Sequence, residues 1–439
     1  MKKLLFLFLI LFNGLTAQHT ISGNFSPAKD FKWLIAYELT PGEQRYVADT
    51  EIKEGYFKME LPAGTTKGNY RLVYAVPQDE YFIDVLYNGQ EDIEFNFNWE
   101  EGVQFIKSDE NILLNNYFAK INEIEKEILA IYQTENTSKT DFLRLTKKLA
   151  ETQTKMEALQ TNSLAHQFIT ANKPYIPKTY EPVEQYLSNK RETYFDHLDF
   201  DNPLLQGSTY LSDKIINYPF STLSPDITSQ SEMESELYGS IAMVGEKIKT
   251  MPEAFKIDVF YQLWKSTNGV KLNNVSDYIF TNHLKNLALK AGKHEMVAEI
   301  ENTNRLRLGE KSPDITWKDG DVTKTLSDLR GAKNYILIFW SSTCSHCLKE
   351  LPPLHKELQK FDSIKVVAVG LEEDRSTWEK ETAQFPFFQH AIALGKWESE
   401  YAKTFNIQKT PTYFILDKDQ HFIAKPESDK EMVAYLKSE

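Results

Sequence analysis

The segment FWSSTCSHCLKELPP, residues 339–353, decides the fold of the last third of this chain. It begins at the end of the run YILIFW (335–340), which is apolar at nearly every position. Runs of this kind are typical of strands buried on both faces of a sheet that helices cover. Two similar runs follow at 364–370 and 412–416, and helical patterns separate the three. The last third is therefore predicted to be an α/β domain.

The only two cysteines of the chain, Cys344 and Cys347, lie in this segment, at the start of a predicted helix. At a helix N-terminus, free backbone N–H groups and the helix dipole stabilise a thiolate. We therefore expect Cys344 to be an exposed nucleophile of lowered pKa and Cys347, one turn further in, to be a buried thiol. A protonated His346 beside Cys344 would lower its pKa further. Two cysteines are too few for a disulfide-stapled scaffold or a four-cysteine zinc site.

Two other roles for the cysteine pair are less favoured than redox exchange. A static disulfide across so small a loop removes little entropy from the unfolded chain. A zinc site that adds His346 or His355 is unusual, because metal sites mostly take their second pair of ligands from a separate segment. Pro352 and Pro353 also disturb the helix before His355. The pair therefore favours exchange between a dithiol and a disulfide.

This part of the chain, from about residue 309 to 439, resembles the thioredoxin superfamily, and within it the exported TlpA-like and ResA-like thiol-disulfide oxidoreductases. Its landmarks occur in the family's order: Phe339-Trp340, the Cys-x-x-Cys pair, Pro352 at the kinking proline and Thr410-Pro411-Thr412 at the cis-proline loop. The resemblance implies a thioredoxin-like fold. It also implies that Cys344 attacks the disulfide of a partner protein and that Cys347 resolves the mixed disulfide.

The same resemblance implies roles for other residues. Pro411 would hold its loop beside the sulfurs through a cis bond, which brings the preceding carbonyl within reach of a substrate strand. Glu350 stands where ResA-like members carry an active-site glutamate and could relay the proton of the buried thiol; the alternative is a solvated glutamate on the helix face. Trp340, His346 and Thr410 are the residues expected to contact the substrate.

Two departures from the family pattern leave the direction of electron flow open. Thr343 occupies the place where many relatives have a second tryptophan, and Ser345-His346 replaces the proline-containing dipeptides of TlpA-like proteins. A histidine before the second cysteine resembles DsbA-type oxidants instead. Because a stabilised thiolate favours the reduced form, it raises the reduction potential.

Two other functions stay open as alternatives. Thr343-Cys344 resembles the surroundings of the peroxiredoxin cysteine, although the earlier proline of that motif is absent, so a thiol peroxidase is one alternative. A non-catalytic binding or scaffold protein with a thioredoxin-like fold is the other. We find no zinc-protease histidine spacing, no phosphate-binding glycine loop and no Gly-x-Ser-x-Gly elbow. No cofactor and no metal are expected.

The N-terminus has the layout of a secretory signal peptide. Two lysines precede the apolar run 4–12, and the small residue Ala17 follows. The run is too short to span a bilayer comfortably. Residues 1–17 are therefore predicted to be cleaved and the protein to be periplasmic, without stable membrane insertion. The alternative is a buried N-terminal strand or helix.

Residues 18–105 are predicted to form a β-rich domain. Short aromatic and β-branched runs alternate with turn residues, and 93–99 alternates strictly between apolar and polar residues. The spacing predicts a small antiparallel β-sandwich, with a barrel as the alternative.

Residues 106–304 are predicted to be mostly α-helical. After a possible N-cap at Ser108 or Asp109, apolar residues follow one helical face. They are Leu113, Tyr117, Ile121, Ile124, Ile128 and Ile131. A second helix is predicted at 141–159, with Phe142, Leu145, Leu149, Met156 and Leu159 facing inward. Further helical stretches are expected near 240–265 and 276–303. A turn-rich stretch at 308–314 predicts that the thioredoxin-like domain spans 305–439.

Composition limits the partners. The chain has 439 residues, 41% of them hydrophobic and 26% charged, as is usual for a globular multidomain protein. Its net charge of −13 argues against nucleic acid or anionic lipid as a main partner. The expected partners are protein thiols and disulfides. A membrane-bound thiol reductase is a possible electron donor, and the residues before 305 are expected to position the redox domain or select its partner.

Overall fold

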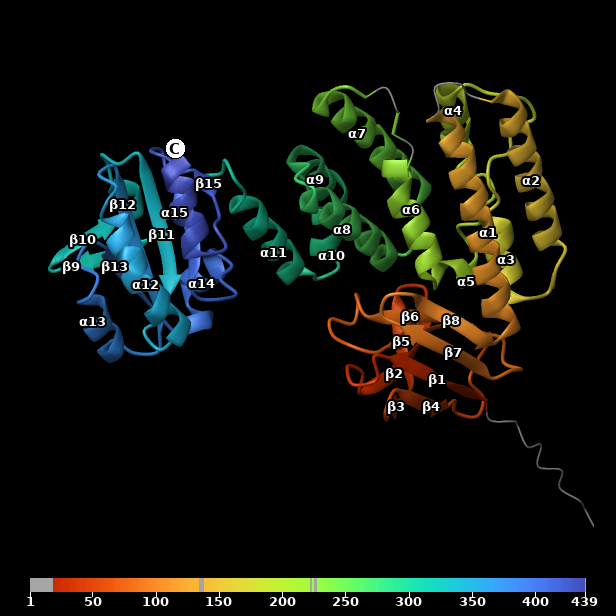
Figure 1. Ribbon diagram of the computed structural model, residues 1–439, viewed down its shortest axis with the longest axis horizontal. Helices are drawn as coiled ribbons and strands as arrows, with labels where there is room; N and C mark the ends of the chain where they lie inside the picture. Colours follow the sequence, from red (N-terminus) through yellow and green to blue (C-terminus); the bar gives the residue numbers. More distant parts are fainter. Residues whose placement is uncertain (1–18, 134–137, 222, 225–226, 439) are drawn as a thin grey trace, which may run out of the picture. The chain divides into compact units, whose positions relative to one another are not determined.

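The computed structural model describes residues 19–133, 138–221, 223–224 and 227–438 (Figure 1). The predicted signal peptide, residues 1–17, lies outside the described residues. The chain divides into two compact units, Met1–Leu287 and Ala288–Glu439. This division differs from the predicted boundary between residues 304 and 305, and the four-part domain organisation stays a prediction. The elements nevertheless follow the expected order of strands, helices and an α/β region.

The first unit opens with a β-sandwich. One sheet has the strand order β4-β1-β7-β8 and the other β3-β2-β5-β6. Both sheets contribute to one buried core, which contains Phe25 and Phe95 from the first sheet and Leu72 and Tyr87 from the second. The strands are β1 (Thr20–Ser26), β2 (Trp33–Thr40), β3 (Glu43–Glu51), β4 (Tyr56–Glu60), β5 (Gly68–Val73), β6 (Phe82–Tyr87), β7 (Ile93–Asn98) and β8 (Gly102–Lys107). The predicted sandwich is confirmed.

The sandwich departs from a purely antiparallel design at one strand pair. β1 runs parallel to β7, with Ile21 opposite Ile93, whereas the other strand pairs in these two sheets are antiparallel. A short turn forces its two strands to be antiparallel, but no turn joins β1 to β7. The two strands approach closely at Gly23, where a Cβ would lie 1.7 Å from the carbonyl oxygen of Phe95.

The helical region begins at α1 (Asp109–Tyr132), whose N-cap is Ser108. The predicted inward face of α1 is buried from Leu113 to Ile128, and Ile131 is half-buried. In α2 (Lys139–Glu157) the predicted inward residues from Phe142 to Met156 are buried as well. Leu159 was wrongly assigned to this face, because the helix ends at Glu157 and Leu159 is 42% exposed.

The remaining helices of this region are α3 (Leu164–Ala171), α4 (Val183–Glu192), α5 (Pro203–Gln206), α6 (Thr209–Ser221), α7 (Gln230–Lys247), α8 (Glu253–Gly269), α9 (Asn273–Ile279), the π-helix η1 (Phe280–Leu284), α10 (Lys285–Lys290) and α11 (His294–Arg305). Within the described ranges, no helix is both long and apolar enough to cross a bilayer.

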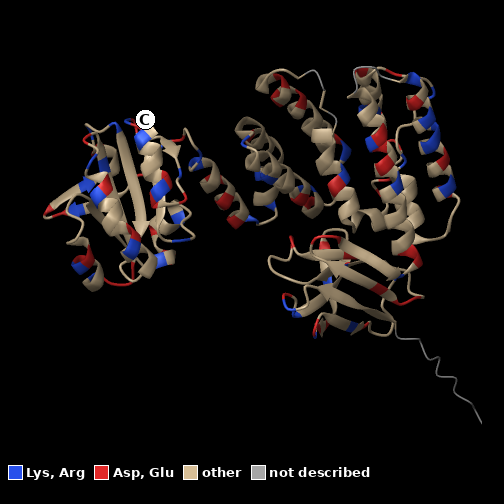
Figure 2. Cartoon of the chain, viewed as in Figure 1, with Lys and Arg blue, Asp and Glu red and all other residues tan. Residues whose placement is uncertain are grey.

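A five-stranded sheet of order β13-β12-β11-β14-β15 forms the centre of the second unit. β11 is buried at every position and carries no charged residue (Figure 2). It pairs in parallel with β12 and antiparallel with β14. Ile338 shares a buried cluster with Leu351 of α12 and Met432 of α15, whereas Leu337 shares another with Ala402 of α14. Helices therefore cover both faces, which confirms the predicted α/β domain.

The strands of this unit are β9 (Thr316–Asp319), β10 (Val322–Thr325), β11 (Asn334–Trp340), β12 (Ile364–Glu372), β13 (Gln389–Leu394), β14 (Thr412–Leu416) and β15 (Phe422–Ala424). Its further helices are α12 (Ser345–Leu358), α13 (Ser376–Thr382), α14 (Glu400–Thr404), α15 (Asp429–Ser438) and the 3₁₀ turns η2 (Leu326–Asp328) and η3 (Lys396–Glu398). β9, β10, β13 and β15 were not predicted, because each is partly exposed and lacks a continuous apolar run.

Candidate active site

Cys344 is the N-cap residue of α12, directly after the loop that leaves β11. Its sulfur accepts a hydrogen bond from the backbone N–H of Cys347 at 3.2 Å. On its other side the sulfur lies 3.6 Å from the carbonyl oxygen of Thr410. The side chain is half-buried. The sulfur of Cys344 thus lies at a helix N-terminus, as the sequence predicts, but the side chain is half-buried and not exposed.

The surroundings of Cys344 favour its thiolate. Burial by itself would raise the pKa of Cys344, but hydrogen bonds outweigh it and lower the pKa below that of an ordinary thiol. The donors include the side chain and backbone N–H of Cys347, the side chain of Thr410 and the backbone N–H of His346. The loss of solvation is therefore more than offset by groups that stabilise the charged sulfur.

Cys347 has the opposite character. It has no exposed surface and belongs to the same core cluster as Trp340 and Tyr413. Burial, with a smaller contribution from Cys344, raises the pKa of Cys347 to about 12. Both cysteines are free thiols in this structure. The pair therefore combines a half-buried sulfur of lowered pKa with a fully buried sulfur of raised pKa.

The loop before β14 completes the surroundings of the sulfurs. The peptide bond between Thr410 and Pro411 is cis, as the resemblance implied. Pro411 is buried and Thr410 is half-buried, with its carbonyl directed at Cys344. A backbone carbonyl next to the nucleophile is a group that an extended substrate strand could pair with.

Glu350 is less solvated than a helix-face glutamate would be. Its side chain is 21% exposed, and Oε1 lies 2.8 Å from Nε2 of His346. The hydroxyl of Tyr413, which is 2% exposed in β14, donates a hydrogen bond of 3.1 Å to Oε2. Sequence reasoning missed Tyr413. The available signal was a hydroxyl group within the apolar run 412–416, because a buried tyrosine hydroxyl usually has a partner.

Two predicted site residues take other roles than expected. Trp340 has no exposed surface and packs edge-to-face on Phe385, with ring centroids 5.9 Å apart, so it cannot contact a substrate in this structure. As the last residue of a fully buried strand, it points into the core. The imidazole of His346 is exposed but pairs with Glu350, so only the backbone N–H of His346 stabilises Cys344.

A buried carboxylate, Glu372, holds the loop before Cys344. Glu372 is 2% exposed and accepts hydrogen bonds from the backbone N–H of Ser342 at 2.5 Å and from its hydroxyl at 2.9 Å. The hydroxyl of Ser341 adds a third at 3.4 Å. The parallel strands β11 and β12 end at the same edge of the sheet, which brings these residues together. Sequence reasoning missed Glu372, because a glutamate after an apolar run normally marks a strand leaving the core.

Comparison with known proteins places this site in a family. A family model described as Thioredoxin-like matches residues 331–422. Thiol-disulfide oxidoreductase YkuV from Bacillus subtilis is 30% identical over 133 residues, which are 86% of its length and 27% of this chain. This chain belongs to the thioredoxin-like family. The thioredoxin-like unit is also 29% identical to thiol-disulfide oxidoreductase ResA from Bacillus thuringiensis subsp. konkukian, over 140 residues that cover 79% of that protein and 30% of this chain.

A solved structure gives a similar match. A domain of a possible thiol-disulfide isomerase from Cytophaga hutchinsonii is 28% identical, with a TM-score of 0.27, and the match covers 92% of that domain and 30% of this chain. The curated relatives identify this thioredoxin-like chain as a thiol-disulfide oxidoreductase. They match only the C-terminal part of the chain, which contains Cys344 and Cys347.

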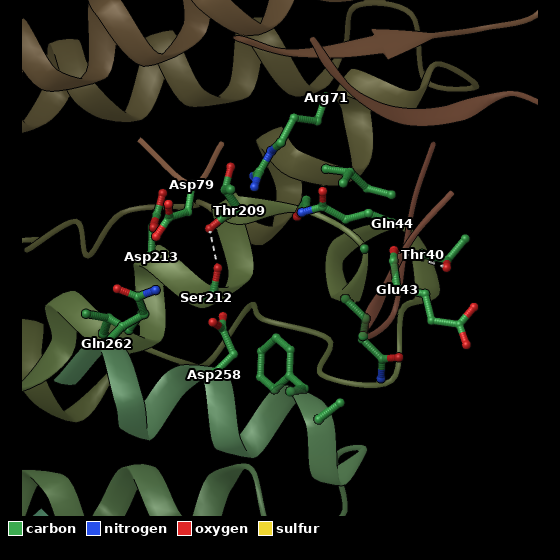
Figure 3. Close-up of a pocket in the computed structure, with 18 of the residues that line it drawn as sticks. Thr40, Glu43, Gln44, Arg71, Asp79, Thr209, Ser212, Asp213, Asp258 and Gln262 are labelled. Carbon is green, nitrogen blue, oxygen red and sulfur yellow. Dashed lines mark hydrogen bonds between the residues drawn. The ribbon is translucent and has the colours of Figure 1, made fainter. Parts of the chain in front are cut away.

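The first unit has a cavity of its own, of about 500 Å³, between the sandwich and helices α6 and α8 (Figure 3). Carboxylates of Asp79, Asp213 and Asp258 line it. Burial raises the pKa of Asp213 and of Asp258. Arg71, also in the wall, is held by Asp84 through two hydrogen bonds of 2.9 and 3.0 Å. In the described part of the chain, no group of three or more histidines, cysteines or carboxylates is arranged to hold a metal ion.

Proposed function

We propose that this enzyme is an exported oxidoreductase that exchanges the Cys344–Cys347 dithiol and disulfide with protein partners through a mixed disulfide. The observation that carries the proposal is the contrast between the two thiols. Cys344 is half-buried and has a lowered pKa, whereas Cys347 is fully buried and has a raised one. Such a pair reacts in a fixed order, because only the thiolate attacks a disulfide.

The exchange has two steps. The thiolate of Cys344 attacks a disulfide of the partner, whose S–S bond breaks; one partner sulfur leaves and takes up a proton, and the other bonds to Cys344. Cys347 then gives its proton to Glu350 and attacks the sulfur of Cys344, and the second partner sulfur leaves. The partner gains two electrons and this chain loses two. The reverse sequence oxidises a partner dithiol, so both directions use the same residues.

The neighbouring residues support these steps. Thr410 and Pro411 place a backbone carbonyl beside Cys344, where it can pair with an extended segment of the partner. Glu350 follows Cys347 by three residues on α12, and side chains at this spacing are neighbours on a helix. A carboxylate there is a suitable proton acceptor for the resolving thiol.

In this proposal the residues before the thioredoxin-like unit direct the protein to its compartment and select its partner. Residues 1–17 direct export, and the mature protein acts in the periplasm, where it takes electrons from another thiol protein such as a membrane-bound reductase. An exported reductase needs such a supply because its compartment is oxidising. The sandwich and helical regions position the redox unit or select its partner. The acidic balance of the chain suits a protein partner better than nucleic acid.

Insulin reduction tests the activity. Residues 18–439, supplied with dithiothreitol, should speed the precipitation of reduced insulin, and Cys344→Ser should reduce the rate to that of dithiothreitol alone. Cys347→Ser, mixed with insulin in the absence of dithiothreitol, should instead accumulate a mixed disulfide, visible as a mass adduct at Cys344. Ser345→Ala is the matched control, because Ser345 is exposed in the same helical turn and carries no sulfur. Equal rates for wild type and Cys344→Ser would exclude the proposed activity.

A further inference from the structure

The carboxylate of Glu350 is held from two sides. A glutamate on the first turns of an exposed helix face normally extends into water. Here one oxygen is bonded to the buried hydroxyl of Tyr413 and the other to the exposed imidazole of His346. The carboxylate therefore connects a buried group of β14 to a group that is 67% exposed.

The hydroxyl of Tyr413 is the donor in this arrangement. Burial raises the pKa of Tyr413, and the negative charge of Glu350 raises it further, with smaller contributions from Asp429 at the start of α15 and from Cys347. The raised pKa favours the protonated phenol, which can therefore hold one oxygen of Glu350 at neutral pH.

The resolving thiol needs a proton acceptor nearby. Cys347 is fully buried, and its pKa is about 12, so almost none of it is ionised at neutral pH. It shares its core cluster with Tyr413, and Glu350 is three residues away on the same helix. Leu351 and Trp340, which are apolar, belong to the same cluster, and the polar neighbours of the Cys347 thiol include Cys344 and Thr410.

We propose that Tyr413 is a positioning residue for the resolution step: its hydroxyl keeps the Glu350 carboxylate turned toward Cys347, and His346 passes the proton from Glu350 to solvent. The inference rests on the proposed function, because it assumes that Cys347 resolves a mixed disulfide. It adds two residues, Tyr413 and His346, that act through Glu350. The proton moves from the sulfur of Cys347 to Glu350, then to Nε2 of a neutral His346 or to water, as the S–S bond forms.

The reaction of the reduced enzyme with dithiobis(nitrobenzoate) separates the two thiols. Cys344 attacks first and releases one thionitrobenzoate at a rate proportional to reagent concentration. Cys347 then attacks the mixed disulfide and releases a second one at a rate independent of reagent. Stopped-flow absorbance of the full mature chain therefore reports the resolution step by itself, for wild type, Tyr413→Phe, Glu350→Gln, the double variant and His346→Gln.

Tyr401→Phe is the matched control. Its hydroxyl accepts a hydrogen bond of 2.7 Å from the backbone N–H of Thr316, and the ring packs against the core cluster on the other face of the sheet. Like Tyr413→Phe, Tyr401→Phe therefore removes one hydrogen-bonded hydroxyl from the second unit. It leaves the surroundings of Cys347 unchanged.

The expected result is a slow second phase in Tyr413→Phe with an unchanged first phase. General bases contribute roughly 10²- to 10⁴-fold, so loss of positioning should slow resolution about tenfold and Glu350→Gln by about 100-fold. In the Glu350→Gln background, Tyr413→Phe should have no further effect. In the single variant, the second-phase rate should also rise more steeply with pH than in wild type, because hydroxide must replace the positioned carboxylate. His346→Gln should slow the second phase by a smaller factor.

Three results would overturn the inference. The second phase of Tyr413→Phe could equal that of wild type at every pH. The slowing could be the same in Tyr401→Phe, which would make it a general effect of lost stability. It could also persist unchanged in the Glu350→Gln background, which would show that Tyr413 does not act through Glu350. A wild-type enzyme that releases no thionitrobenzoate would refute the proposed function as well, and the first phase distinguishes that failure from the others.

Discussion

The buried carboxylate of Glu372 makes a quantitative prediction about the loop that carries Cys344. In Glu372→Ala, the backbone N–H of Ser342, which is 3% exposed, loses its acceptor. A buried donor without a partner costs about 1–3 kcal/mol. The hydroxyl of Ser341 keeps Thr343 as a partner at 3.1 Å, so its loss matters less. We expect the loop to be destabilised by about 2 kcal/mol relative to its open form.

Hydrogen exchange measures this local opening. A cost of about 2 kcal/mol corresponds to roughly 30-fold faster exchange of the amides in the loop, because each 1.4 kcal/mol is a factor of ten. Mass spectrometry of a peptide that contains residues 341–344 would record the change in the reduced protein. The neighbouring residue provides the control, since Glu373 is exposed and Glu373→Ala removes the same group without touching the loop.

The reasoning would be refuted by equal exchange in wild type and Glu372→Ala, or by an equal increase in Glu373→Ala. Either result would mean that the hydrogen bonds to Glu372 do not stabilise the loop. A second readout is the pH dependence of Cys344 alkylation. Since this loop leads directly to the N-cap of α12, loosening it should move the pKa of Cys344 toward the value of an ordinary thiol.

Three further predictions follow from single residues. Iodoacetamide should alkylate Cys344 of the native protein with a pH midpoint below that of free cysteine. It should leave the buried Cys347 unmodified. A midpoint for Cys344 at the free-thiol value would contradict the argument that hydrogen bonds lower its pKa. Burial lowers the pKa of His390 from 6.5, so the unfolded chain binds its proton more readily and stability should fall below about pH 6.5, by at most about 1.4 kcal/mol per pH unit. His390→Leu should make the melting temperature less dependent on pH between about pH 5.5 and about pH 6.5, and an unchanged slope would exclude this residue. Gly23→Ala should lower the melting temperature of the sandwich by several degrees, a loss of 2 kcal/mol or more, because a Cβ there meets the carbonyl of Phe95; a neutral effect would show that β1 can move away from β7.

Patterns within short stretches predicted much of the fold. The apolar face from Leu113 to Ile128 and the apolar run 335–340 of β11 match the buried surfaces of the structure. The different characters of Cys344 and Cys347 also follow from local position, because the first ends a loop at a helix N-terminus and the second lies one turn inside. Periodicity explains the buried faces, and the helix N-terminus explains the two cysteines. Both causes act over only a few residues.

Contacts between distant segments were decided by the tertiary structure alone. The parallel pairing of β1 with β7, the bond from Tyr413 to Glu350 and the anchoring of Ser342 by Glu372 join residues that lie 72, 63 and 30 positions apart. Local periodicity carries no information about which distant side chains meet, because that depends on strand order and on which strand ends share an edge. The sequence by itself thus determined that a cysteine pair lies at the start of a helix. The positions of β12 and β14 beside β11 in the sheet decided that Glu372 bonds to the loop before this helix and that Tyr413 bonds to Glu350.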